Sequence, residues 1–297
     1  MVLYRSPLVE WAESVLNLEQ IIENAYLKTG NEKHNQRISV EDLCWLIGFW
    51  LGSESFNMQS IASDDNEYKE LQFELNRIAN NLNLLVLSAD EVSALSLDDL
   101  DQVLHFGWFG LFTANYKKSS VKEYNIFWQI LLELGIAETK SCTQDLIVGL
   151  ATQSKSSREN LLGGLTDSSG SYCFDDDIDG HYSILQRFDQ KVDVSCIKLA
   201  RHVARSLGLN SVGYSYNDNP KLETKSHNTI LLYIGGLGTE DIKCKLKKEK
   251  SAEFCDLEFI TFNQGFTCKP YKHGRYYGFT LESPSNGRFI MGWTWYA

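Results

Sequence analysis

The sequence lacks most of the features that mark secreted, membrane or metal-cluster proteins. It holds only 4 prolines and no low-complexity run, which argues against long disordered linkers. Its longest apolar run, residues 43–51, is too short to cross a bilayer, and residues 1–7 lack the apolar core of a signal peptide. The 7 cysteines include no CxxC pair, which disfavours a cysteine-ligated metal cluster. We therefore expect a soluble, intracellular protein whose thiols are reduced and mostly buried.

Basic residues are scarce relative to acidic ones. The chain carries 28 Lys and Arg against 39 Asp and Glu, for a formal net charge of −11. Proteins dedicated to nucleic acid gather basic side chains on the phosphates, so this balance counts against a strongly basic binding face. No P-loop or GxSxG nucleophile elbow occurs, and the 6 histidines are far apart, so these sequence motifs assign no reaction.

The chain is organised around residues 161–170, which read LLGGLTDSSG. Leucines recur there with helical spacing, and Gly163 and Gly164 remove side chains where another backbone could come close. A near copy, LIGFWLGSE, occupies residues 46–54. We expect a short apolar helix over 161–166 and a second helix in the copy, packed on each other through their glycines.

Periodicity and turn residues predict the elements around these two stretches. Ser39 and Asp42 are placed to form a capping box at the start of the first motif helix, and Gly135 and Gly208 are placed to end later helices. The expected helices are 8–28, 43–51, 67–82, 122–134 and 195–207, and the expected strands are 56–62, 84–87, 109–114, 172–174, 182–185, 211–216 and 229–234.

The order helix, strands, helix occurs twice, and corresponding elements of the two copies are separated by nearly the same number of residues. The motif helices correspond to each other, and so do the helix ends at Leu82-Asn83-Leu84 and Leu207-Gly208-Leu209. Such a repeat favours two halves related by a pseudo-twofold axis, which meet at the glycine-bearing helices.

The two stretches resemble the LAGLIDADG motif of homing endonucleases, in the yeast group of the vacuolar-ATPase intein and the mating-type-switching endonuclease. Residues 40–43, 206–209 and 276–281 add to the resemblance, the last being similar to the C-terminal splicing block of such inteins. The resemblance implies an α+β fold with two pseudo-twofold related halves, whose mixed sheets form a saddle, and a remnant of a β-rich splicing domain. The implied division is an N-terminal remnant or linker helix at 1–38, a first half at 39–150, a second half at 151–255 and the splicing remnant at 256–297.

In that family an acidic residue at the eighth position of each motif binds the divalent ions that cut both DNA strands. Here these positions are Ser53 and Ser169, so both acids are replaced by neutral, weak ligands. The nearest carboxylates are Glu54, which would require the helix end to unwind, and Asp167. These two are the candidate catalytic acids and Mg²⁺ ligands if cleavage survives. The alternative for Asp167 is a cap on the turn that follows it.

The resemblance also implies lysines near the active centre. Lys247 and Lys248 occupy one expected place, and Lys140 lies near the other. The alternative is that the lysines between 243 and 250 form a solvated basic face. The run 201–205, which contains two arginines and a histidine, is likewise interpreted as a solvated helix face.

The expected DNA-reading and splicing regions are both altered. The hairpin of the second half carries four aspartates at 175–179, where DNA-reading strands carry basic and amide side chains, and we interpret it as a solvated turn because EF-hand spacing is absent. Inteins begin with Cys or Ser and end with His-Asn, whereas this chain begins Met-Val-Leu and ends Trp-Tyr-Ala. No excision chemistry is expected.

These observations predict a homing-endonuclease-like, DNA-interacting protein. The family activity is site-specific, Mg²⁺-dependent cleavage of double-stranded DNA, and we expect cleavage and splicing to be lost here. The alternatives are a non-cleaving, sequence-specific DNA-binding protein and an acidic protein-interaction module. We expect double-stranded DNA as the partner, no membrane, a monomer with an internal pseudo-dimer, a nuclear location if DNA is bound, and Mg²⁺ as the only cofactor if the protein is active.

Overall fold

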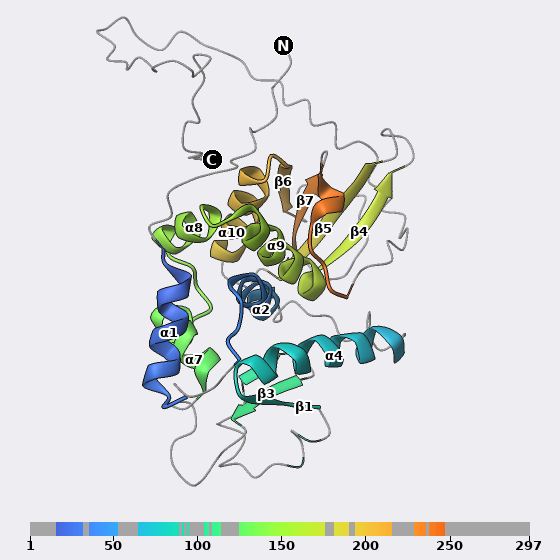
Figure 1. Cartoon of the computed structure of the whole chain (residues 1–297). Coiled ribbons are helices and arrows are strands. Elements are labelled where there is room, and N and C mark those ends of the chain that lie inside the picture. Colours follow the sequence, from blue (N-terminus) through green and yellow to red (C-terminus); the bar gives the residue numbers. More distant parts are fainter. Residues whose placement is uncertain are drawn as a thin grey trace, which may run out of the picture. The chain divides into compact units, whose positions relative to one another are not determined.

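The computed structural model describes one compact unit within Tyr4–Phe262, drawn in colour in Figure 1. The predicted strand 56–62, residues 1–15 and the predicted splicing remnant lie outside the described residues. The described residues are 16–31, 36–52, 65–88, 91, 94, 104–106, 109–113, 125–175, 181–189, 194–215, 229–235 and 238–246.

Two helices form the core of this unit. Helix α2 (Val40–Gly52) packs on α9 (Lys155–Ser169), and every residue of α2 from Leu43 and of α9 from Ser157 is buried. A helix that is buried on all sides is enclosed by other parts of the protein. The two motif stretches are therefore the structural centre on which the other elements pack.

The backbones of α2 and α9 touch at two glycines. A Cβ added to Gly48 would lie 2.2 Å from the carbonyl oxygen of Leu161, and one added to Gly164 would lie 2.0 Å from that of Trp45. Atoms cannot approach so closely, so neither position accepts a larger residue unless the helices move apart. The prediction that the two motif helices pack through their glycines is confirmed for this pair.

Helix α9 is longer than the predicted helix over 161–166. It begins where the side chain of Ser154 accepts a hydrogen bond from the backbone N–H of Ser157. In its polar C-terminal turn the buried hydroxyls of Thr166 and Ser168 are satisfied within the helix, because they donate to carbonyl oxygens one turn earlier. The apolar pattern marks only the most hydrophobic part of this helix.

The second half continues from α9 into a four-stranded antiparallel sheet with the order β4-β5-β7-β6. Helix α10 (Val194–Ser206) connects β5 to β6, and both α9 and α10 contact the sheet. The predicted pairing of the hairpin strands is confirmed, with Tyr172 opposite Ile184, whereas the aspartate-rich turn, residues 176–180, lies outside the described residues. The strands are β4 (Gly170–Asp175), β5 (His181–Asp189), β6 (Asn210–Ser215) and β7 (Thr229–Gly235).

The first half contains helix α4 (Asp65–Asn81) and a three-stranded sheet with the order β1-β3-β2. Its strands are β1 (Leu84–Leu87), β2 (Leu104–Phe106) and β3 (Phe109–Thr113), and β2 was not predicted. Every strand pair in the described ranges is antiparallel, so the expectation of mixed sheets is wrong for this part of the chain.

Both halves turn from helix to strand in the same way. Asn83 joins α4 to β1 with a φ of 53°, and Gly208 joins α10 to β6 with a φ of 79°. The N–H of Asn83 donates to the carbonyl oxygen of Asn80, and the N–H of Gly208 donates to that of Arg205. A left-handed residue at a helix end suits Gly best and Asn next. The repeat seen in the sequence is therefore a structural repeat at this junction.

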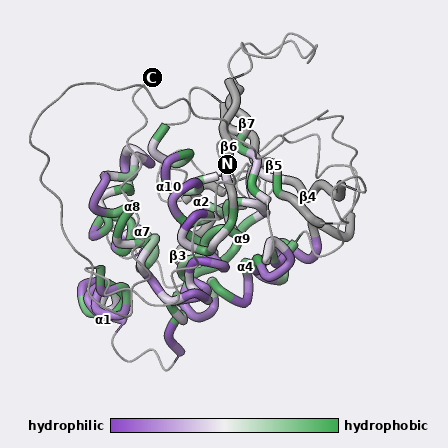
Figure 2. Tube along the Cα trace, turned by 90° about the horizontal axis from the view of Figure 1, so that it is seen from above, coloured by the Kyte–Doolittle hydropathy of each residue, from purple (hydrophilic) through white to green (hydrophobic). Residues whose placement is uncertain are grey.

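Three further helices pack around the core: α1 (Leu18–Lys28), α7 (Ile126–Glu133) and α8 (Gln144–Ala151), of which α8 was not predicted. Helix α1 lies against α7 and buries Tyr26, and α8 lies against α10. Figure 2 shows both hydrophobic and hydrophilic residues in α1, as in a helix with one buried face. Helix α1, which lies within the segment predicted as an N-terminal remnant or linker, therefore contributes to the core.

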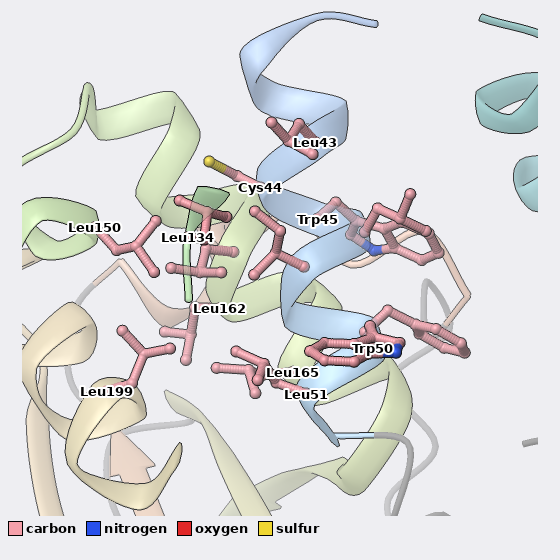
Figure 3. Packing of buried hydrophobic residues seen from close by; sticks show 14 of the residues in the cluster. Leu43, Cys44, Trp45, Trp50, Leu51, Leu134, Leu150, Leu162, Leu165 and Leu199 are labelled. Atoms are coloured by element: carbon pink, nitrogen blue, oxygen red, sulfur yellow. The ribbon is translucent and has the colours of Figure 1, made fainter. Parts of the chain in front are cut away.

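Leucines from several elements meet beside the helix pair. Leu134, Leu150, Leu162 and Leu199 lie in one cluster, although they come from four separate segments (Figure 3). Burying each such side chain contributes about 1.5–3 kcal/mol. Cys44, Cys142, Cys196 and Cys244 are free thiols, and the first three are buried, as predicted. No helix in the described ranges is long and apolar enough to span a membrane.

Candidate functional site at the ends of the paired helices

The C-terminal ends of α2 and α9 meet at the place where the resemblance puts the catalytic acids. A Cβ on Gly52 would lie 1.9 Å from Oγ of Ser168 and 3.2 Å from Oγ of Ser169. Helix α2 thus ends beside the eighth position of the second motif. Ser53 and Glu54 follow Gly52 in the sequence and lie outside the described residues.

The hydroxyls at the end of α9 are turned back onto their own helix. Ser169 donates to the carbonyl oxygen of Leu165 at 2.9 Å, and Ser168 donates to that of Gly164 at 3.0 Å. Both serines are buried. The eighth position of the second motif therefore supplies a neutral oxygen and no charge, where a divalent ion prefers carboxylates.

The carboxylate of Asp167 lies in the interior, with an exposed fraction of 0%. Its Oδ2 accepts from Nε1 of Trp45 at 2.8 Å and from the backbone N–H of Lys245 at 2.7 Å, and its Oδ1 accepts from the N–H of Leu246 at 3.3 Å. The interpretation of Asp167 as a cap on the following turn is wrong, because the N–H groups it accepts from belong to residues far along the chain. This donor set does not fit a Mg²⁺ ion, which requires open carboxylate oxygens.

The segment that Asp167 holds, residues 243–246, is called the clasp below. A Cβ on Gly163 would lie 2.2 Å from the carbonyl oxygen of Lys243, whose N–H approaches the carbonyl oxygen of Glu159 at 3.4 Å. The two adjacent glycines therefore have different partners: Gly164 contacts α2, whereas Gly163 contacts the clasp. The expectation that both glycines serve the helix pair is wrong for Gly163.

Lys245 ties the clasp to the first half of the chain. Its Nζ lies 2.9 Å from Oδ1 of Asp42 on α2 and 3.8 Å from Oε2 of Glu74 on α4. The same ammonium lies over the ring of Trp45, 5.5 Å from its centroid. Lys245 is largely buried in this ionic cluster, so the interpretation of the lysines at 243–250 as a solvated face is wrong for Lys245.

Arg77 of α4 completes the cluster. Its two terminal nitrogens donate to both oxygens of Asp42 at 2.8 and 2.6 Å. Burial alone would raise the pKa of Asp42, but the hydrogen bonds from Arg77 and Lys245 lower it to about 2. The predicted capping box is half confirmed: Oγ of Ser39 accepts from the N–H of Asp42, while the Asp42 carboxylate pairs with the two cations.

Lys140 lies at the C-terminal end of α2. Its Nζ is 3.4 Å from the carbonyl oxygen of Trp50 and 4.8 Å from the centroid of the Trp50 indole. A cation at this end of a helix complements the helix dipole. The predicted position of Lys140 near the helix ends is therefore matched by the geometry, whereas Lys247 and Lys248 lie outside the described residues.

In the part of the chain that the structure describes, no three His, Cys, Asp or Glu side chains are grouped so that they could hold a metal ion. The sequence reasoning missed Trp45 and Lys245, which hold Asp167 and the clasp. One signal was available for Trp45, because a buried indole N–H requires an acceptor. The described groups at the helix ends are arranged to lock two helices and a clasp together.

Comparison with known proteins assigns no family to this chain. No family model matches it, and no curated protein matches it. The resemblance to homing endonucleases therefore stays a prediction from the motif residues.

Proposed function

We propose that this chain is a homing-endonuclease-like, DNA-interacting protein in which strand cleavage and splicing are lost. The observation that carries the proposal is the contact between the two motif helices, which interlock at Gly48 and Gly164 and end beside each other at Gly52 and Ser168. In the family that the sequence resembles, paired helices of this kind place the two catalytic positions together.

The arrangement of the halves gives further support. Each half has a helix that ends in a left-handed residue and leads into an antiparallel sheet. Strands of such a sheet can enter the major groove of DNA and read base edges there. Two such sheets, one in each half, suit a bipartite DNA site.

The proposed loss of cleavage rests on the two candidate catalytic acids, Glu54 and Asp167. Cleavage through Glu54 and Asp167 would require Asp167 to give up hydrogen bonds from Trp45, Lys245 and Leu246. A buried carboxylate that loses such donors carries a penalty of about 1–3 kcal/mol or more. Non-cleaving DNA binding is therefore the form of the function that the described geometry supports best.

A cleavage assay tests this proposal. The protein is incubated with a library of duplex DNA in Mg²⁺ or Mn²⁺, and we expect retention of DNA in mobility-shift gels without cut product. Lys247→Ala combined with Lys248→Ala should weaken the retention. Robust cutting that Glu54→Gln abolishes would overturn the loss of cleavage. Unchanged mobility of every duplex at low salt would overturn DNA binding itself.

A further inference from the structure

We draw no further inference here: the strongest candidate, the pocket of about 450 Å³ between the first turns of α1 and α2 and the turn that precedes α9, is charged only by helix N-termini and by the carboxylates of Glu19 and Glu41, and nothing in the described part of the chain shows what would occupy it.

Discussion

Trp45 donates its indole N–H to the carboxylate of Asp167 at 2.8 Å, across 122 residues of sequence. The bond joins α2 to α9 within their buried contact. The same carboxylate holds the clasp through the N–H groups of Lys245 and Leu246. One side chain thus fixes three segments, and it does so at the C-terminal end of the second motif.

Replacing Asp167 by Asn should destabilise the protein by about 1–3 kcal/mol. The amide removes the negative charge that three N–H groups share, and its NH₂ group faces donors where an acceptor is required. Urea unfolding measures the change. Asp241→Asn is the matched control, because Asp241 is exposed and its pair with Lys155 lies on the surface, so its cost should stay within about 1 kcal/mol. Equal effects of the two variants would contradict this role for Asp167.

Gly164→Ala should cost about 3 kcal/mol or more, because its Cβ would fall 2.0 Å from the carbonyl oxygen of Trp45 and force the helices apart. Gly135→Ala serves as the comparison. Gly135 has open space around it but a φ of 71°, so only about 1–2 kcal/mol of backbone strain is expected. Thermal and urea unfolding measure both. A smaller loss at Gly164 than at Gly135 would refute backbone contact between the helices.

Gly163→Ala should loosen the clasp rather than the helix pair. The new methyl group would meet the carbonyl oxygen of Lys243, and α2 lies on another side of α9. Hydrogen exchange should therefore become faster at the N–H groups of Lys245 and Leu246, while exchange in the middle of α2 changes less. In Gly164→Ala, exchange should become faster mainly in the middle of α2 and change less in the clasp. The same exchange pattern in both variants would show that the two glycines do not have separate partners.

The Asp42 cluster should stabilise the fold only while its carboxylate is charged. The folded-state pKa is lowered from 3.8 to about 2, so the stabilisation is fully present above about pH 4 and is lost as pH falls toward 2. The shift corresponds to roughly 2 kcal/mol. Urea unfolding of wild type and Asp42→Asn should therefore differ at pH 6 and converge near pH 2. A difference that stays constant across this range would contradict the ionic role of Asp42.

Local patterns predicted most of the described elements. Helices α2, α4 and α10 followed from apolar spacing, and Asn83 and Gly208 marked the two helix ends because few residues tolerate a left-handed backbone. Helix α9 was predicted too short because Lys155–Asn160 has no apolar periodicity and forms helix through its Ser154 cap and its packing.

The contacts of the site were harder to predict from the sequence. The glycine pair pointed to a close helix contact, but nothing local distinguishes Gly163 from Gly164. Lys245 and Asp42 are 203 residues apart, so their ion pair depends on the tertiary fold and leaves no trace in the sequence pattern. Asp167 was correctly singled out as a carboxylate near the helix end, while its partners could be found only in three dimensions.

The central claim is that the paired motif helices belong to a protein that retains DNA without cutting it. The most direct measurement is selection of bound duplexes from a random pool at low salt, followed by titration with salt and by incubation in Mg²⁺. We expect retained duplexes whose affinity falls linearly on a log–log plot against salt and whose strands stay intact. Retention of no duplex above background, or specific cutting of the retained duplexes in Mg²⁺, would contradict it.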